Sequence, residues 1–498
     1  MSKIRLKRKI NLLDATMLVM GSMIGSGIFI VSAGVAQQVG SPAYILITWL
    51  VAGILTIIAA LSYGELAGMM PKAGGQYVYL REAYGELVGF LFGWTTFLVI
   101  ETGLIAAVSM AFAKFAAVLM PSLFEPLELF TIGNFTFTTI QLTAFLVLNL
   151  LTFVNLQGIE LGKMVQNLFT MTKVSALGML ILIGLYVGYD SFYWRVNMAD
   201  FWQPFKTVVE NGVVIKMPLS GFTLVSAVGL AMIGPIFSSS AWNTITYAAG
   251  EIIEPKVNIP RSLFLGTLGV AILYALANLT YIALLPTVGT PIGSDVAAHG
   301  IAFASEERVG TAVAEVLFDD MGADVMAVFI MISTFGCVNG IILAGARVYY
   351  AMAQDGLFFK RAAQLDTKTR VPRFALIIQA VWASVLCLSG TYSDLLKYVT
   401  FATLLFYILT IGGVFILRVT SPDAERPYKA FGYPYIPAIY ILVASAICIN
   451  LLVFESPISL FGLSVKPSWV GLSIVLLGIP VYFLRKKGEN TEGSLSKE

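Results

Sequence analysis

The sequence predicts an all-α integral membrane protein with twelve membrane-spanning helices. Of its 498 residues, 58% are hydrophobic and only 12% are charged, whereas a soluble domain carries about 25% charged residues. Twelve apolar runs are long enough to cross ~30 Å of hydrocarbon, and the first and sixth contain residues that interrupt a helix. The expected surrounding is therefore the lipid bilayer, and the net charge of +2 gives no reason to expect a nucleic-acid partner.

The apolar runs follow one another with mostly short connections. They lie near 12–38, 42–70, 86–118, 138–156, 165–188, 222–252, 262–286, 322–353, 374–390, 395–418, 436–454 and 468–484. An even number of spans places both termini on one side of the membrane. Two connections are long, and we expect an ordered cap from 190–220 and a short helix within 288–321.

The charges of the connecting segments predict the orientation. Five of the first nine residues are basic, the loop after the eighth run is also basic, and the segment 288–321 is acidic. Because basic loops remain in the cytoplasm, we predict a multi-pass protein of the cell membrane with both termini cytoplasmic. The first run is too long for a signal-peptide core, so we expect it to be retained.

The first run is interrupted between Met20 and Phe29, where three glycines and two serines occur in ten residues. Glycine costs a helix about 1 kcal/mol relative to alanine. Broken backbone in a membrane is tolerated where it lines a cavity, and its freed N–H groups can hold an anion. Gly21 and Gly25 also fit a close-packing motif, so a small-residue packing face is the alternative.

The sixth run is interrupted between Gly234 and Asn243, where a proline precedes three serines. Proline removes a backbone donor, and serine hydroxyls compete for backbone hydrogen bonds. The alternative for Ser238, Ser239 and Ser240 is that their hydroxyls simply bond back to helical carbonyls. Interruptions five spans apart favour a binding site between two five-helix repeats of opposite topology.

This pattern predicts a division of the chain. We expect an N-terminal tail at 1–11, a first repeat at 12–188, an extracellular segment at 189–221, a second repeat at 222–418, two further spans at 419–486 and a C-terminal tail at 487–498.

The interrupted stretches resemble the signatures of the amino acid–polyamine–organocation superfamily. The resemblance rests on Gly21 to Phe29 in the first run, and on Phe237 to Asn243 and Pro255 to Arg261 around the sixth. The eighth-run segment Phe335 to Gly340 is similar to the L-type amino acid transporter branch. This resemblance implies the LeuT-type fold and transport of amino acids without sodium, by alternating access.

The resemblance also implies roles for particular residues. The N–H groups of Ser26, Gly27 and Ile28 would bind the substrate carboxylate, with Ile24 and Gly25 in the same unwound stretch. On the sixth run, carbonyls of Phe237, Ser238 and Ser240 would bind the substrate ammonium, with Ser239 in the same unwound stretch of the substrate site. Phe237 would also cover the site from outside.

Two departures from the animal L-type transporters affect the expected substrate and partners. Those proteins have glycines where this chain has Ser240 and Ala241, so a smaller pocket and small neutral substrates are expected. The loop near 119–137 has no cysteine, so no disulfide-linked heavy subunit is expected at that position. We predict a monomer or weak homodimer.

Two charged residues lie inside apolar runs, where a charge costs ~3 kcal/mol or more. The resemblance implies that the Lys173 ammonium occupies the position of a sodium ion in sodium-coupled relatives; the alternative is a lysine that extends to the inner surface. Glu101 is interpreted as a contact for a polar substrate, a proton site or a structural partner. Asn339 either lines the pocket or forms a helix–helix hydrogen bond.

Polar residues near the inner ends of the spans are candidates for an inner gate, although a solvated loop network would look the same. They are Glu65, Gln76, Glu251 and Arg261. Trp242 and Asn243 are expected to restart and pack the second half of the sixth helix.

No enzyme chemistry is visible in the sequence. Cys337, Cys387 and Cys448 are scattered through apolar runs, which suggests neither a disulfide framework nor a metal site. No phosphate-binding loop stands out, so no cofactor is expected. We predict a sodium-independent exchanger of small neutral amino acids. The alternatives are a proton-coupled symporter, a cationic amino acid or polyamine permease, and a membrane receptor that binds nutrients.

Overall fold

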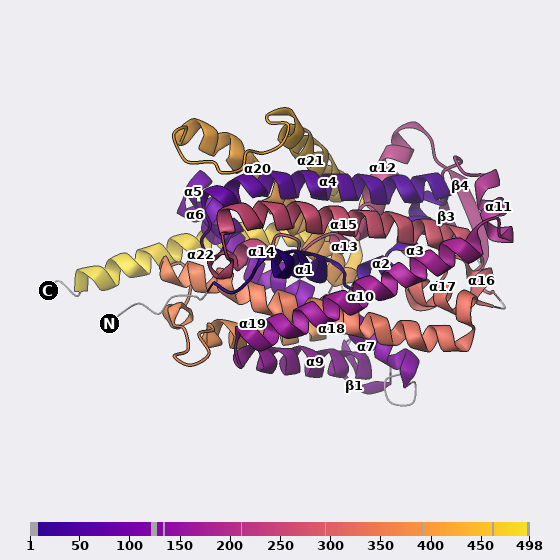
Figure 1. Ribbon diagram of the computed structural model, residues 1–498, viewed down its shortest axis with the longest axis horizontal. Coiled ribbons are helices and arrows are strands. Elements are labelled where there is room, and N and C mark those ends of the chain that lie inside the picture. Colours follow the sequence, from indigo (N-terminus) through magenta and orange to yellow (C-terminus); the bar gives the residue numbers. More distant parts are fainter. Residues whose placement is uncertain are drawn as a thin grey trace.

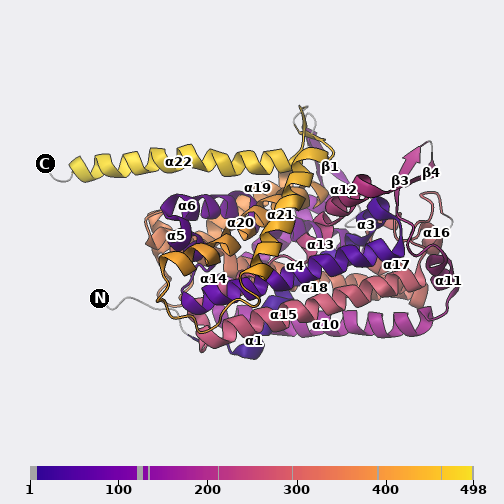
Figure 2. The same ribbon diagram turned by 90° about the horizontal axis from the view of Figure 1, so that it is seen from above.

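Long apolar helices run side by side along the longest axis of the protein in the computed structural model (Figure 1). The structure describes residues 8–120, 127–132, 135–210, 212–293, 295–389, 392–460 and 463–495. Both ends of the chain lie at the same end of the bundle, on the left of Figures 1 and 2, which we call the termini end. This placement is the one expected from an even number of spans.

The first half of the chain contains the first five spans. Their elements are α1 (Leu12–Met23), α2 (Gly27–Ile30), α3 (Ser32–Val39), α4 (Pro42–Met69), α5 (Gln76–Tyr84), α6 (Glu86–Thr95), a π-helical turn (Thr96–Ile100), α7 (Glu101–Leu119), α9 (Thr139–Leu156) and α10 (Ile159–Gly188). The sequence dictates several helix starts. Asn11 and Asp14 form a capping box at α1, and Ser41 caps α4 in front of a proline at its first position.

The second half contains the remaining spans. Their elements are α12 (Gly221–Ala231), α13 (Ile233–Ser238), α14 (Thr244–Tyr247), a 3₁₀ turn (Ala249–Glu251), α15 (Pro255–Leu284), α18 (Asp320–Gln354), α19 (Arg373–Ser389), α20 (Tyr392–Thr420), α21 (Tyr435–Phe454) and α22 (Pro467–Leu495). A 3₁₀ turn (Lys360–Ala363) lies between α18 and α19.

Short elements lie in the connections between the spans. They are the hairpins β1–β2 (Glu128–Ile132, Phe135–Thr138), β3–β4 (Phe205–Glu210, Val213–Pro218) and β5–β6 (Ile458–Leu460, Leu463–Val465), the helices α11 (Phe192–Ala199), α16 (Val296–His299) and α17 (Val309–Phe318), and a 3₁₀ turn (Ser305–Glu307). Of these, α11, α16, α17 and the β3–β4 hairpin lie at the end opposite the termini, on the right of Figures 1 and 2. The ordered segment expected at 190–220 is therefore α11 with the β3–β4 hairpin. The short helix expected within 288–321 is α17.

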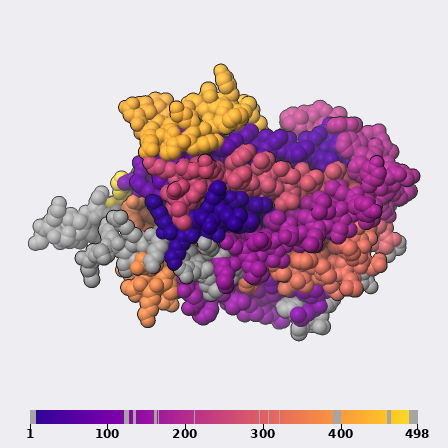
Figure 3. Space-filling view, viewed as in Figure 1, coloured from indigo at the N-terminus to yellow at the C-terminus, as the bar shows by residue number. Residues whose placement is uncertain are grey.

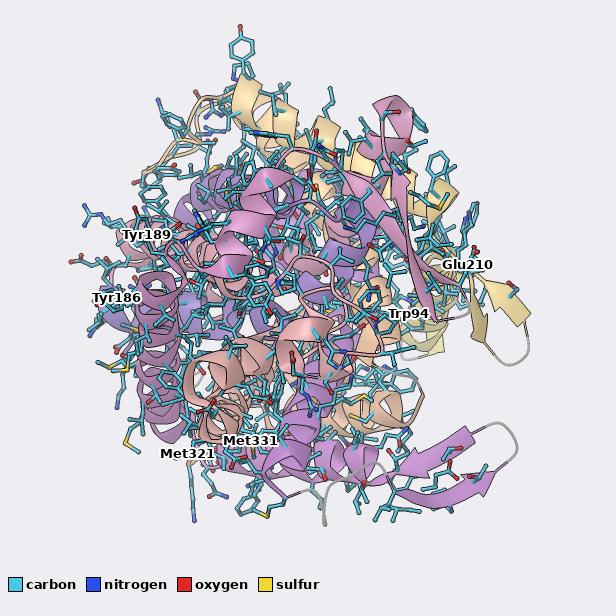
Figure 4. All side chains as sticks on the ribbon, turned by 90° about the vertical axis from the view of Figure 1, so that its right-hand side faces the viewer. Trp94, Tyr186, Tyr189, Glu210, Met321 and Met331 are labelled. Atoms are coloured by element: carbon cyan, nitrogen blue, oxygen red, sulfur yellow. The ribbon has the colours of Figure 1, made fainter. Side chains whose placement is uncertain are left out.

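Eleven helices of the described chain are long and apolar enough to cross a membrane. The remaining predicted run, the ninth, near 374–390, forms α19, which is apolar but shorter. Tyr186 and Tyr189, near the end of α10, point away from the bundle in Figure 4. Exposed tyrosines at a helix end are typical of the membrane–water interface. The helical membrane fold predicted from the sequence is thus confirmed.

Corresponding helices of the two halves pack against each other. The second and seventh spans, α4 and α15, lie side by side, as do the third and eighth, α7 and α18. Helix α1 lies between α15 and α10 on the face shown in Figure 3.

Candidate functional site

The first span unwinds at Ile24, Gly25 and Ser26. Helix α1 ends with Ile24 in an extended conformation, at φ −76° and ψ 90°. The helix resumes at Gly27 as α2, and α3 follows with almost no interruption, since the Val35 N–H donates to Val31 O across the junction. The first N–H groups of a helix have no carbonyl partner within it. The predicted interruption is therefore present, and a half-helix begins at its far side.

The sixth span unwinds between Ser238 and Thr244. Ala241, in the middle, has φ +64°, a conformation that non-glycine residues rarely adopt. Two of the three serines bond back to the helix, because Ser238 Oγ donates to Gly234 O at 2.8 Å and Ser240 Oγ donates to Phe237 O at 2.6 Å. The hydroxyls of Ser238 and Ser240 therefore bond back to helical carbonyls, as the alternative interpretation proposed. The helix is nevertheless broken at this point.

The two interruptions face each other. A Cβ atom added to Gly27 would lie 2.2 Å from Ser238 Oγ, so no larger residue fits between them. The Tyr274 hydroxyl on α15 lies 3.0 Å from Met23 O and 3.1 Å from Ser238 O. Ser26, Gly27, Ile28, Phe237 and the three serines are all buried. The structure thus brings the two predicted stretches together at Gly27 and Ser238, and the other residues predicted to bind substrate are buried in the same two stretches.

Tyr274 was not singled out by sequence reasoning. Its place in an apolar run looked like ordinary packing, and only the fold shows that its hydroxyl touches both interruptions. Ser333 on α18 was missed for the same reason, and its Oγ donates to Ile24 O at 3.0 Å.

Replacing Tyr274 with phenylalanine leaves two buried carbonyls without that hydroxyl. An unsatisfied buried polar group costs about 1–3 kcal/mol. We expect Tyr274→Phe to lower the melting temperature of the purified protein and to slow transport, whereas Tyr186→Phe, at an exposed tyrosine, leaves both unchanged. Equal melting temperatures and rates for the two variants would contradict this role.

Lys173 on α10 is almost fully buried and reaches the first interruption. Its Nζ donates to Gly21 O, to Ile24 O at 2.6 Å and, more weakly, to Ser333 O at 3.4 Å. The ammonium therefore joins the fifth, first and eighth spans at the point where α1 ends. A lysine that extends to the inner surface would not make these contacts.

Glu101 lies on the third span, immediately after the π-helical turn Thr96–Ile100. Such turns insert an extra residue and are frequent at functional sites. Its side chain is 3% exposed and borders a small cavity. The cavity also borders Ser240 and Ala241 of the sixth span. Its remaining lining residues are Gln76, Phe92, Ile100, Leu104, Asn243, Tyr247, Val399, Thr403, Phe406 and Tyr407.

Gln76 and Asn339 lie in other surroundings than an inner gate and a substrate pocket, which were among the positions considered for them. Gln76, considered for an inner gate, donates from Nε2 to Thr410 Oγ1 and accepts from Asn243 Nδ2 beside the Glu101 cavity. Asn339 Oδ1 accepts from Asn155 Nδ2 at 2.8 Å, a contact between α18 and α9. This geometry is that of the helix–helix hydrogen bond, not of a residue lining the described cavity.

One buried and one half-buried ion pair lie towards the termini end. Arg347 on α18 lies 3.1 Å from Glu251, both 2% exposed, and Arg418 on α20 lies 2.7 Å from Glu65. The N–H groups of Lys9 and Ile10 also donate to Glu251 O, which ties the start of the chain to the end of the sixth span. Arg261 is exposed and outside these contacts.

The opposite end of the site is covered by α17. Gly310 of this helix packs against Phe29, so closely that an added Cβ would lie 2.6 Å from the Phe29 ring. Gln37 Nε2 also donates to Ala302 O, which holds the preceding segment to α3. The two interruptions are therefore enclosed from both ends of the bundle.

Comparison with known proteins identifies relatives of the whole chain. It is 30% identical to human "Large neutral amino acids transporter small subunit 2" over 488 residues, which are 97% of this chain and 81% of that protein. It is 29% identical to mouse "b(0,+)-type amino acid transporter 1" over 487 residues, covering 96% and 88% of the two chains. For human "Asc-type amino acid transporter 1" the identity is 28%, covering 97% and 83%. A family profile described as "Amino acid permease" matches residues 10–480, so the chain belongs to the amino acid permease family.

Proposed function

We propose that the protein exchanges small neutral L-amino acids across the cell membrane without sodium. The observation that carries this proposal is the juxtaposition of the two interruptions, with the start of a half-helix at Gly27 facing the unwound backbone near Ser238. A helix start favours an anion, and unwound carbonyls favour a cation. The site is therefore suited to the carboxylate and ammonium of an amino acid. The names of the relatives above support an amino acid as the substrate, although the first of them names large neutral amino acids.

The pocket beyond the backbone site suits small side chains. Ser240 and Ala241 add side-chain volume at the unwound part of the sixth span, and the Trp242 ring behind them packs against Tyr63 with ring centres 4.7 Å apart. Because these walls are close-packed, a large aromatic substrate would need neighbouring rings to move.

Lys173 is proposed to replace a metal cation. Its ammonium is bound by backbone carbonyls of the first and eighth spans, which are the ligand type that a sodium ion would use. A permanently attached cation at this position makes transport independent of sodium.

We further propose that both termini are cytoplasmic, that residues 12–188 and 222–418 are the two repeats, and that the chain works as a monomer or weak homodimer. No disulfide-linked subunit is required in this proposal. Cys337, Cys387 and Cys448 are free and buried, and part of the 119–137 connection lies outside the described residues.

Transport by purified protein in liposomes tests this function. Liposomes are loaded with unlabelled alanine or left empty, and labelled alanine, serine, leucine or arginine is added in sodium-free buffer. We expect alanine and serine to enter loaded liposomes much faster than empty ones, with leucine slower. Preferred uptake of arginine would instead indicate a cationic permease. Binding without uptake would indicate a receptor.

A further inference from the structure

The carboxyl group of Glu101 lies without a counter-charge in the middle of the third span. The span runs from Glu86 to Leu119, so Glu101 is about halfway across it. In the described part of the chain, its Oε2 atom is buried and has no hydrogen-bond partner, and no ion pair involves this residue. Burying an isolated carboxylate in a low-dielectric interior is so costly that such groups bind a cation or a proton.

Most polar groups around the cavity do not compensate this carboxyl, because they bond to one another. The exception is the Thr403 hydroxyl, which is buried without a hydrogen-bond partner in the described chain and, being neutral, supplies no counter-charge. Asn243 Nδ2 donates to Gln76 Oε1 at 2.8 Å and also lies 2.8 Å from the Tyr247 hydroxyl, while the Tyr407 hydroxyl donates to Asn243 Oδ1 at 3.1 Å. Gln76 Nε2 in turn donates to Thr410 Oγ1. This network is closed on itself and leaves Glu101 outside.

Among the side chains that the structure describes, which exclude those of 391–398 at the start of α20, the helices packed against α7 offer no free cation to Glu101. The nearby titratable groups are phenols and a thiol: Tyr247 on α14, Tyr407 on α20, and Tyr349 and Cys337 on α18. Two cations face other groups, since Arg347 on α18 pairs with Glu251 and Lys173 bonds to backbone carbonyls. Helix α9 has no titratable residue, and α19 has Arg373 and Cys387 towards its ends.

An acceptor close to Glu101 also lacks a donor. Gln379 Oε1 is buried without a hydrogen-bond partner in the described chain, and both Gln379 and Glu101 pack against Gly345. A protonated carboxyl group is a donor, whereas a carboxylate only accepts. A proton on Glu101 would therefore remove the buried charge and supply a donor next to an unpaired acceptor.

We propose that Glu101 takes up and releases a proton during the transport cycle, so that amino acid movement is coupled to a proton gradient. The step is the reversible protonation of the carboxylate to the carboxylic acid, with no other bond made or broken. The cavity volume is about 10 Å³, which is at the lower limit for holding one water molecule and is too small for a substrate side chain in this conformation. Ser240 and Ala241 border the same cavity, which connects Glu101 to the substrate site. This inference rests on the proposed function and adds a second mode to it. At equal pH alanine exchanges for alanine, whereas a proton gradient drives net uptake because the carrier then returns without substrate.

The test measures accumulation against an amino acid gradient. Liposomes that contain the protein, and equal alanine inside and outside, are given an external medium about one pH unit more acidic, with the membrane potential clamped. One pH unit is a tenfold proton ratio. Coupling one proton to one alanine should accumulate labelled alanine roughly tenfold. We expect Glu101→Gln to lose this accumulation but to keep alanine exchange at equal pH.

Glu210→Gln is the matched control, because Glu210 is an exposed carboxyl on strand β3, labelled in Figure 4. It should accumulate alanine like the unchanged protein.

A pH-sensitive dye inside liposomes of the unchanged protein gives a second readout that does not depend on the folding of the Glu101 variant. Added external alanine should acidify the interior of these liposomes. Accumulation by Glu101→Gln, or its absence in the unchanged protein, would overturn the proposal. Loss of exchange in the unchanged protein would instead overturn the proposed function. A change of preference between arginine and alanine in Glu101→Gln would show a substrate contact and would also overturn the proton role.

Discussion

Lys173→Ala should abolish sodium-free amino acid exchange. The substitution removes the donor of hydrogen bonds to Gly21 O, Ile24 O and Ser333 O, all buried where α1 ends. A hydrogen bond to a charged group contributes about 1.5–3 kcal/mol, so losing the two shorter ones weakens the site by 3 kcal/mol or more. We expect the exchange rate to fall roughly 100-fold or more. The measurement is uptake of labelled alanine into alanine-loaded liposomes.

The control for this variant is Lys256→Ala, which removes an exposed lysine paired with Glu425. It should transport at the unchanged rate. Repeating the assay of Lys173→Ala with added sodium examines the proposed replacement of an ion, because a small cation could then enter the vacated carbonyl site. A variant with normal sodium-free exchange would contradict the role of Lys173, and sodium stimulation of the unchanged protein would contradict the proposed replacement.

Gly27→Ala should have an effect of similar size, because it separates the two interruptions. The added methyl group would lie 2.2 Å from Ser238 Oγ and 3.0 Å from Ser238 Cα, and the second of these belongs to the backbone. Overpacking of this kind typically costs about 1–3 kcal/mol. Here it also displaces the backbone that binds substrate, so we expect exchange to fall at least tenfold and alanine binding to weaken.

Gly34→Ala is the matched control, since Gly34 lies seven residues further along the same span and an added Cβ meets nothing within 4 Å. Alanine also favours a helix over glycine by about 1 kcal/mol. Gly34→Ala should therefore transport normally and melt no lower than the unchanged protein. Normal exchange by Gly27→Ala would show that the two interruptions do not form the substrate site.

Much of the fold could be predicted because membrane helices are determined by local composition. Apolar length predicts the spans, and the small or helix-breaking residues near Gly25 and Pro235 predict where two of them unwind. Lys173 lies inside an apolar run, and this position predicted a buried ammonium group. A buried ammonium group in turn needs hydrogen-bond acceptors. These inferences use neighbours along the chain, so one sequence is enough.

The remaining features depend on contacts between distant segments. The π-helical turn before Glu101 has no signal in the apolar sequence Thr96–Ile100, and the hydroxyl of Tyr274 is informative only beside Met23 and Ser238. Gln76 looked like a gate residue because it lies near the end of a span. The loop Pro71–Gly75 lets it enter the bundle, where Asn243 and Thr410 satisfy its amide.

We propose that an amino acid is held between the unwound parts of the first and sixth spans. An experimental structure with bound L-alanine in sodium-free buffer would show whether it is. We expect the carboxylate at the N–H groups of Ser26, Gly27 and Ile28, the ammonium at carbonyls between Phe237 and Ser240, and Lys173 still on Ile24 O. Alanine bound elsewhere, with neither interruption in contact, would contradict it.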